Sequence, residues 1–292
     1  MNQPVTPSMT EQHSAHEHCD ILIIGAGPAG LAAALAAAPS GAAITIVDDN
    51  PQPGGQIWRD GAQVALPALA QQHRAALARH TNIRLLPGTR VVGLGDSQPG
   101  DKAPALLLED ADRGWTQHSH RIVLCTGARE LLLPFPGWTL PGVTGAGALQ
   151  ALIKAGLDVH GQRIVVAGTG PLLLAAAATA TQAGATVVRV AEQAPWSALA
   201  GFAAQLPRWP AKAAQAITLL HTRLRANSHV LEVQGTTQVQ AVRLRKGPHG
   251  EETIACDRVA CGFGLVPNTH LGQMLGCSLG GPLSSGQGLA VD

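Results

Sequence analysis

The feature that most constrains this chain is a glycine motif between an apolar run and an alanine-rich stretch. Residues 20–24 (DILII) form a short apolar run, typical of a buried parallel strand. The motif Gly25-Ala-Gly27-Pro28-Ala29-Gly30 follows, and then an Ala/Leu stretch that ends at Pro39, typical of a helix. Residues 43–47 form the next apolar run, which ends at Asp48. This order predicts a strand–turn–helix–strand unit.

Each glycine of the motif has its own task in binding a dinucleotide. Gly25 allows a tight turn, Gly27 lets a pyrophosphate approach the backbone, and Gly30 lets the helix pack on the strand. The helix that follows the motif, expected over residues 31–38, offers N–H groups and the positive end of its dipole to phosphates. Asp48 lies at the end of the second strand, where a carboxylate can accept hydrogen bonds from ribose hydroxyls. In this context the motif predicts a dinucleotide site rather than a bare turn.

A second glycine-rich segment, residues 51–59 (PQPGGQIWR), follows the acid. The adjacent Gly54 and Gly55 allow the backbone to lie against a flat ligand. Gln56 and Arg59 are candidates for contacts with phosphate or ring carbonyls, and the alternative is a surface turn with an exposed arginine. Later in the chain, an apolar strand over residues 121–125 ends in Thr126-Gly127, small residues that allow close approach of an adenine group.

The second half of the chain repeats the order of these elements. A strand over residues 163–167 leads into Gly168-Thr-Gly170, an Ala-rich helix and a strand that ends near Glu192. Leu173 replaces the third glycine of the motif. A second nucleotide site and a structural copy without a ligand are both compatible with this pattern.

Composition and missing motifs exclude several classes of function. The 292 residues are 46% hydrophobic and 13% charged with a net charge of +1, which excludes a disordered chain and argues against nucleic-acid binding. We expect no membrane span, because polar residues, Gly or Pro interrupt every apolar run. The five cysteines form no CxxC pair, which argues against a redox disulfide, a metal site and secretion, and favours the cytoplasm. No catalytic acid or base is identified, and His73, His80, His118 and His120 are interpreted as solvated.

Together these segments resemble the two-domain flavoproteins of the pyridine nucleotide-disulfide oxidoreductase superfamily. Residues 51–59, 133–143 (LPFPGWTLPGV), 167–174 (AGTGPLLL) and 262–271 (GFGLVPNTHL) are similar to one branch. That branch comprises the FAD-bearing subunits of opine oxidases, hydrogen cyanide synthase and heteromeric proline or hydroxyproline dehydrogenases. The resemblance implies an α/β fold with two Rossmann-like three-layer (ββα-type) domains, the second inserted into the first.

The resemblance also implies domain bounds and ligands. It implies a loose tail (residues 1–18), an FAD-binding domain (19–145), an NAD(P)-binding-like domain (146–262) and an incomplete return to the first domain (263–292). NAD(P) would bind at Gly168, Gly170 and Glu192, although electron transfer to a partner makes this use doubtful. The residues implied for FAD are Gly25, Gly27, Pro28, Ala29, Gly30, Asp48, Gly54, Gly55, Gln56, Arg59, Val91, Thr126 and Gly127.

By the same resemblance, the chain is an FAD-dependent oxidoreductase subunit in amine, opine or amino-acid oxidation. Its flavin would pass electrons to a flavoprotein oxidase-like subunit, to a small iron–sulfur subunit or to a respiratory acceptor. The alternatives are an NAD(P)H-dependent flavin reductase that feeds a ferredoxin-type carrier, and a truncated non-catalytic subunit. The sequence stops at Asp292, before the Gly-Asp segment with which this family returns to the flavin. We therefore expect weak FAD retention by this chain alone and an unpaired edge in its first sheet.

Overall fold

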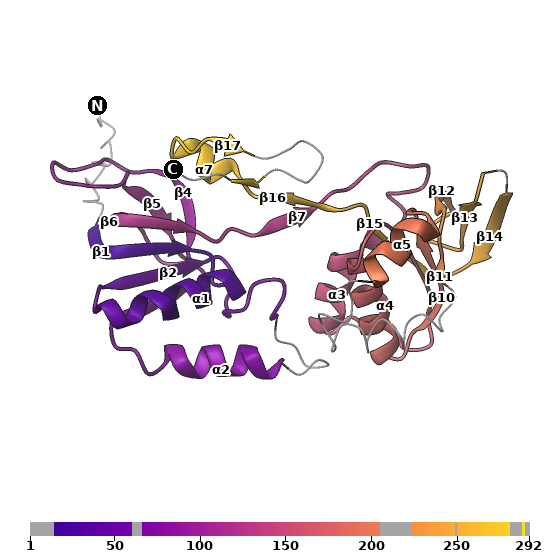
Figure 1. Cartoon of the computed structure of the whole chain (residues 1–292), viewed down its shortest axis with the longest axis horizontal. Helices are drawn as coiled ribbons and strands as arrows, with labels where there is room; N and C mark the ends of the chain where they lie inside the picture. The colour runs from indigo at the N-terminus through magenta and orange to yellow at the C-terminus, as the bar shows by residue number, and fades with distance from the viewer. Residues whose placement is uncertain (1–14, 60–65, 205–223, 249, 281–287, 290–292) are drawn as a thin grey trace, which may run out of the picture. The chain divides into compact units, whose positions relative to one another are not determined.

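The computed structural model describes residues 15–59, 66–204, 224–248, 250–280 and 288–289, and the chain divides into two units (Figure 1). Unit 1 comprises residues 1–58, 67–126 and 270–278, and unit 2 comprises residues 59–66, 127–269 and 279–292. The chain passes from unit 1 to unit 2 after residue 126 and returns to unit 1 at residue 270, so the main part of unit 2, residues 127–269, is inserted in unit 1.

Unit 1 is built on a six-stranded sheet of order β3-β2-β1-β6-β5-β4. Strands β3, β2, β1 and β6 are parallel, whereas β5 and β4 form an antiparallel extension. Leu22 and Ile23 of the central strand and Ile46 beside them are fully buried. The elements of this unit are β1 (Ala15–Ile24), α1 (Pro28–Ala37), η1 (Ala38–Ser40), β2 (Ile44–Asp48), α2 (Ala68–Leu77), β3 (Ile83–Pro87), β4 (Arg90–Leu94), β5 (Leu106–Glu109), β6 (Gly114–Leu124) and α7 (His270–Met274).

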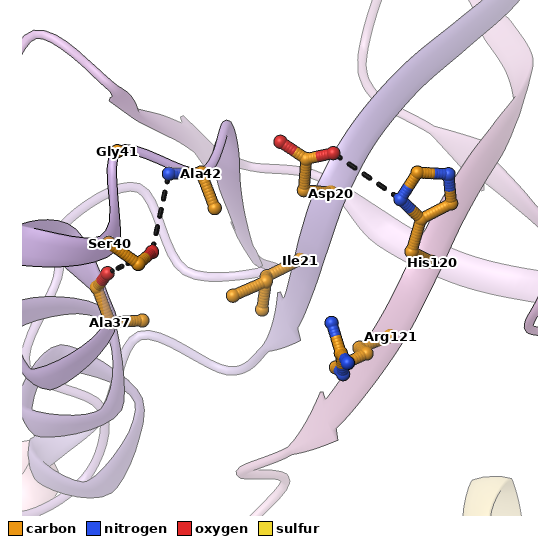
Figure 2. Close-up of a pocket in the computed structure, with 8 residues that line it drawn as sticks. All are labelled: Asp20, Ile21, Ala37, Ser40, Gly41, Ala42, His120 and Arg121. Carbon is orange, nitrogen blue, oxygen red and sulfur yellow. Dashed lines mark hydrogen bonds and ion pairs between the residues drawn. The ribbon is translucent and has the colours of Figure 1, made fainter.

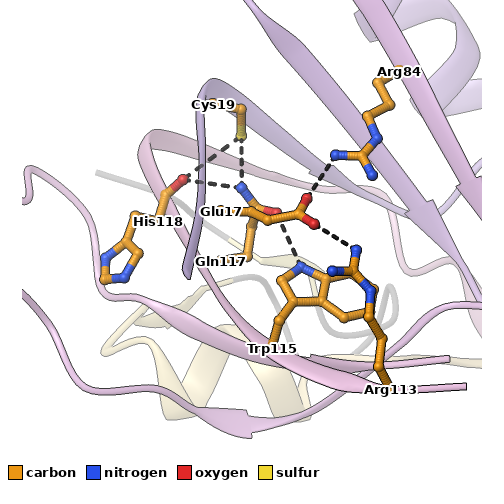
Figure 3. A network of polar contacts seen from close by, with 7 residues as sticks. All are labelled: Glu17, Cys19, Arg84, Arg113, Trp115, Gln117 and His118. Atoms are coloured by element: carbon orange, nitrogen blue, oxygen red, sulfur yellow. Dashed lines mark hydrogen bonds and ion pairs between the residues drawn. The ribbon is translucent and has the colours of Figure 1, made fainter. Parts of the chain in front are cut away.

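The central strand begins earlier than the sequence predicts. Residues 15–18, expected to be part of a loose tail, belong to β1, and the rest of that tail (residues 1–14) lies outside the described residues. The first half of β1 pairs with an equally extended β6. The Glu17 carboxylate accepts hydrogen bonds from Arg84 Nη1 at 2.6 Å and Arg113 Nη2 at 2.5 Å (Figure 3). These bonds are formed only in the folded sheet, which explains why a polar segment is ordered there.

A histidine cluster lies on the same pair of strands. His118 of β6 is 1% exposed, so the interpretation of this residue as solvated is wrong. Its Nδ1 atom is 2.9 Å from Asp101 Oδ2, and its Nε2 atom is 2.9 Å from His16 Nδ1. The ring of His18 stacks on it with the centroids 4.7 Å apart. The cluster therefore joins the first half of β1 to β6.

The edge of β6 beyond Gln117 has a strand on one side only. Within the described residues, β5 pairs with residues 114–117, whereas β1 pairs with β6 along its whole length. Ile122 and Leu124 are half-buried there.

Unit 2 has three layers. A parallel sheet of order β11-β10-β9-β15-β8 lies between helices α3 and α4 on one face and the antiparallel sheet β12-β13-β14 on the other, with an apolar cluster on each face. A two-stranded ribbon joins β7 to β16, and a second joins β17 to β18. The elements are β7 (Ala128–Glu130), β8 (Val143–Gly145), α3 (Ala146–Lys154), β9 (Arg163–Gly168), α4 (Leu172–Gln182), β10 (Thr186–Glu192), α5 (Trp196–Ala203), β11 (Leu224–Arg225), β12 (Ser228–Gln234), β13 (Ala241–Lys246), β14 (Gly250–Ala255), β15 (Arg258–Gly262), β16 (Leu265–Pro267), β17 (Leu279–Gly280) and β18 (Gly288–Leu289).

The expected α/β class with two Rossmann-like units is confirmed. Residues 127–145, expected in the first domain, group with unit 2. The reason is that β7 pairs with β16 and β8 pairs with β15. Of residues 263–292, expected as a return to the first domain, residues 270–278 group with unit 1 and the remainder with unit 2. None of the helices in the described part of the chain is long and apolar enough to span a membrane.

Candidate functional site

The first glycine turn, Gly25–Gly30, joins the carboxyl end of β1 to α1. Gly25 has φ +103°, and a Cβ atom there would lie 2.3 Å from the carbonyl oxygen of Cys125. A Cβ atom on Gly30 would lie 1.8 Å from the carbonyl oxygen of Gly25. Both positions therefore require glycine for the chain to fold, whatever the turn binds.

Gly27 differs from its two neighbours. A Cβ atom there would meet nothing within 4 Å, and the backbone has an ordinary extended conformation at φ −70°. Gly27 is the N-cap of α1, and no side chain caps the helix. The N–H groups of a first helical turn need partners from outside the helix, and a phosphate is a suitable one. The open space in front of α1 therefore fits the pyrophosphate of a dinucleotide.

Asp48 ties the second strand to this turn. Its side chain is 8% exposed, and its Oδ2 atom accepts a hydrogen bond from the N–H of Ala26 at 2.5 Å. Its Oδ1 atom accepts from the N–H of Asn50 at 2.8 Å and from Asn50 Nδ2 at 2.7 Å. An ionised carboxylate has about four acceptor positions, so one remains for a ribose hydroxyl. Asn50 was missed in the sequence, although a polar residue two positions beyond a strand-end acid is a visible signal.

The second glycine turn, Pro53–Trp58, packs against the first. The N–H of Gly54 donates to the carbonyl oxygen of Ala26 at 2.8 Å, and a Cβ atom on Gly55 would lie 3.1 Å from the Cα atom of Gly27. Gly54 and Gly55 have φ values of +128° and +57°, which favour glycine. Gln56 of this turn is exposed. The structure thus brings both glycine turns and Asp48 together around one space.

The other candidates for this site have different surroundings. Val91 packs against the apolar cluster of unit 1 that contains Trp115. Thr126 directly follows Cys125, whose carbonyl oxygen would lie 2.3 Å from a Cβ atom on Gly25. Gly127 and Arg59 group with unit 2. The carbonyl of Gly127 accepts from the N–H of Asn268 at 3.0 Å, and burial and the Arg59 charge lower the pKa of Lys154. The roles of these four residues toward a dinucleotide stay predictions.

Unit 2 repeats the same arrangement, but its acid bonds to a different residue of the turn. Gly168 has φ +139°, and a Cβ atom there would lie 1.9 Å from the carbonyl oxygen of Gly262. Glu192 is 4% exposed, and its carboxylate accepts from the N–H of Gly170 at 3.0 Å and of Ala194 at 2.9 Å. In unit 1 the Asp48 carboxylate accepts from Ala26, the residue between the first two glycines of the motif. In unit 2 the longer Glu192 side chain accepts from Gly170, the second glycine.

The residue at the third glycine position also differs between the units. Leu173 of α4 is 1% exposed and packs in the apolar cluster under the helices. A Cβ atom on Gly262 would lie 3.0 Å from Leu173 Cδ2, so the bulk of the leucine is accommodated by a glycine on the neighbouring strand. A Cβ atom on Gly170 would meet nothing within 4 Å. Unit 2 therefore keeps an open turn and a strand-end acid despite the missing glycine.

Burial makes three of the cysteine thiols poor nucleophiles. All five are free thiols. Burial raises the pKa of Cys125, and it raises the pKa of Cys256 and of Cys261 to about 12, so these thiols stay protonated at neutral pH. The described residues contain no group of three or more histidine, cysteine or acidic side chains arranged to hold a metal ion.

A shallow pocket of about 640 Å³ lies elsewhere on unit 1 (Figure 2). It is lined by Asp20 and Ile21 of β1, by Ala37 at the end of α1, and by His120, which pairs with Asp20 at 3.3 Å. The glycine turns are at the other end of α1 and of the strand. This pocket is therefore separate from the space around Gly27.

Comparison with known proteins agrees with this geometry. A model of the family described as pyridine nucleotide-disulphide oxidoreductase matches residues 19–292. An opine oxidase subunit from Rhizobium meliloti (strain 1021) is 30% identical, over 89% of this chain and 59% of that protein. Hydrogen cyanide synthase subunit HcnB of Pseudomonas aeruginosa is 31% identical, over 89% of this chain and 60% of that protein. The chain thus spans less than two thirds of the length of these relatives.

Solved structures share the fold. L-proline dehydrogenase from P. horikoshii superposes with a TM-score of 0.63 at 18% identity, over 95% of this chain and 49% of that chain. Thioredoxin reductase from T. acidophilum gives a TM-score of 0.64 at 21% identity, over 90% and 83%. The two-unit architecture is therefore a known one.

Proposed function

The chain belongs to the pyridine nucleotide-disulphide oxidoreductase family, and we propose that it is an FAD-binding subunit that serves the oxidation of amines, opines or amino acids such as proline. The family consists of oxidoreductases and implies FAD as cofactor, with NAD(P) bound in related members. Relatives over most of this chain are subunits of opine oxidase, hydrogen cyanide synthase and sarcosine oxidase. Their names support the presence of a partner subunit. That this partner is a flavoprotein or an iron–sulfur protein that takes part in electron transfer is part of our proposal.

The open position at Gly27 carries this proposal. Gly25 and Gly30 are glycines because neighbouring backbone would collide with any side chain, whereas the space beside Gly27 is open. A chain that needed only a tight turn would tolerate a side chain there. The glycine is explained by a ligand whose phosphates lie against the first turn of α1.

The residues of unit 1 would bind and orient this cofactor. The N-terminal turn of α1 would hold the pyrophosphate, Asp48 would accept from the adenosine ribose, and Gly54 and Gly55 would let the backbone lie along the ligand. Bound FAD would supply the redox chemistry, by accepting the two electrons removed from the substrate. In this proposal, the protein fixes the position and the electrostatic surroundings of the cofactor.

A second candidate function is supported by unit 2. The Glu192 carboxylate holds the turn of Gly168 and Gly170 as Asp48 holds the first turn. A working nucleotide site here would allow NAD(P)H to reduce the flavin, and the chain would then feed electrons to a ferredoxin-type carrier. An acid at the end of the second strand favours NADH over NADPH, since its charge repels a 2′-phosphate.

Flavin uptake and reduction test these functions. Because weak retention is expected, the full chain is titrated with FAD, kept in the presence of the cofactor, and mixed without oxygen with L-proline, sarcosine, octopine or NADH. We expect bound flavin that loses its visible absorbance with at least one of the three amino compounds. Loss of absorbance with NADH alone supports the second candidate. FAD uptake without reduction by any of the four contradicts direct oxidation by this chain, and a folded chain that takes up no FAD overturns the proposal.

A further inference from the structure

The second glycine turn forms one wall of the space at Gly27, so its position affects what fits there. Its N–H at Gly54 bonds to Ala26, and Gly55 lies against the backbone of Gly27. Two adjacent glycines have the largest conformational freedom of any residue pair in the unfolded chain. A turn of this composition needs contacts from outside to keep one geometry.

Helix α2 supplies these contacts. Arg74 Nη2 donates a hydrogen bond to the carbonyl oxygen of Pro53, the residue directly before the two glycines. At the other end of the turn, the ring of Trp58 is 9% exposed and contacts the ring of His73, with the centroids 5.2 Å apart and the planes tilted by 58°. His73 is itself held by a bond of 2.9 Å between its Nδ1 atom and the carbonyl oxygen of Leu69.

The composition of α2 agrees with this role. Ala70 is its only buried residue, so the helix contributes little to the apolar core of the unit. Its half-buried polar side chains, Arg74 and His73, are those that contact the turn. A charge-assisted bond from a guanidinium to a backbone carbonyl is stronger than a neutral one.

We propose that Arg74 and His73 are positioning residues for the cofactor, which hold the second glycine turn against Gly27 from outside and so set the width of the phosphate space. This inference rests on the proposed function, because it assumes that FAD lies in unit 1. Neither side chain needs to touch the ligand. Their effect passes through Pro53 and Trp58 to the backbone of Gly54 and Gly55.

The test compares Arg74→Met with the matched control Arg79→Met. Methionine keeps an unbranched apolar side chain and removes the donor, and Arg79 is an exposed arginine just beyond the same helix. Three quantities are measured on the full chain: the Kd for FAD from flavin fluorescence, the unfolding midpoint without FAD, and amide hydrogen exchange at residues 54–58 without FAD. His73→Leu is treated in the same way.

For Arg74→Met we expect about tenfold weaker FAD binding, which corresponds to about 1.4 kcal/mol, and faster exchange at Gly54 and Trp58. We expect the midpoint of the cofactor-free protein to change little. Arg74→Lys restores part of the affinity, because the ammonium keeps the charge without the planar fork. Arg79→Met leaves all three quantities unchanged.

Unchanged FAD affinity in Arg74→Met would overturn the inference. A lower midpoint of the cofactor-free protein together with unchanged affinity would indicate that Arg74 has a structural role only. If the unmodified chain binds no FAD, the proposed function fails. Amide hydrogen exchange gives an independent check. If exchange at residues 54–58 is as slow in Arg74→Met as in the unmodified chain, Arg74 does not hold the turn.

Discussion

At the scale of single residues, the three glycines of the first turn separate folding from binding. Because a Cβ atom on Gly27 would meet no atom within 4 Å, we predict that Gly27→Ala changes the free energy of unfolding by less than about 0.5 kcal/mol. The added methyl group would stand where phosphates approach, so FAD affinity is expected to fall at least about tenfold. Urea unfolding and FAD titration measure the two effects.

Two other glycines serve as controls for this prediction. Gly30→Ala would place Cβ 1.8 Å from the carbonyl oxygen of Gly25, so we expect it to destabilise the fold by about 1–3 kcal/mol. Gly93→Ala on β4 also enters open space, and it should leave both stability and FAD affinity unchanged. Equal FAD affinity in Gly27→Ala and Gly93→Ala would contradict a phosphate site at Gly27.

At the scale of elements, α3 is capped by a side chain from another element. The Glu130 carboxylate of β7 accepts from the N–H groups of Gly147 at 2.7 Å and Ala148 at 2.9 Å. The helix has no capping side chain of its own, and its N-cap is Gly145. A Cβ atom on Gly145 would lie 2.2 Å from Glu130 Oε2. The glycine and the carboxylate therefore depend on each other.

We predict that Glu130→Ala lowers the unfolding free energy of unit 2 by about 1–2 kcal/mol, because it removes two hydrogen bonds and a negative charge at a helix N-terminus. Glu130→Gln keeps one acceptor oxygen and should lose less. Urea unfolding followed by far-ultraviolet circular dichroism measures both variants. Equal stability of Glu130→Ala and the unmodified chain would show that water replaces the carboxylate without cost.

At the scale of the whole molecule, each unit contains a carboxylate that arginine holds ionised. Burial raises the pKa of Glu17, but hydrogen bonds from Arg113 and Arg84 outweigh this effect and lower it below its ordinary value. Bonds from the side chain and the backbone N–H of Arg163 lower the pKa of Asp257 in unit 2. Both groups therefore bind a proton more readily in the unfolded chain than in the folded one.

The sign of the pH dependence follows from these directions. The two carboxylates stabilise the fold above their ordinary pKa of about 4, and the stabilisation is lost as the pH falls through the lower pKa of the folded state. We predict that Glu17→Gln and Asp257→Asn each lower the free energy of unfolding by about 0.5–1 kcal/mol at neutral pH. In each variant this free energy should also fall less steeply as the pH is lowered into the acid range. Urea unfolding at several pH values measures this, and a fall as steep as in the unmodified chain in both variants would refute it.

Several parts of the fold could be predicted because they are local. The second half of β1, which ends at Ile24, the helix α1 and the strand that ends at Asp48 are each determined by consecutive residues. The additional residues at the start of β1 and β6 could not be predicted, because their polar side chains depend on distant partners. Glu17 bonds to arginines 67 and 96 positions away, and His118 contacts Asp101, 17 positions away. The contacts of α2 with the second glycine turn could not be predicted either, because they also join residues that are far apart in the sequence.

The sequence by itself determined where this chain turns tightly and where an acid follows a buried strand, since glycine conformation and apolar runs are properties of neighbouring residues. The tertiary structure alone decided which glycines are required sterically, since that depends on the carbonyls of Cys125 and Gly262 from distant strands. It also decided that Leu173 can replace a glycine, because the space that a side chain needs is made by other parts of the chain.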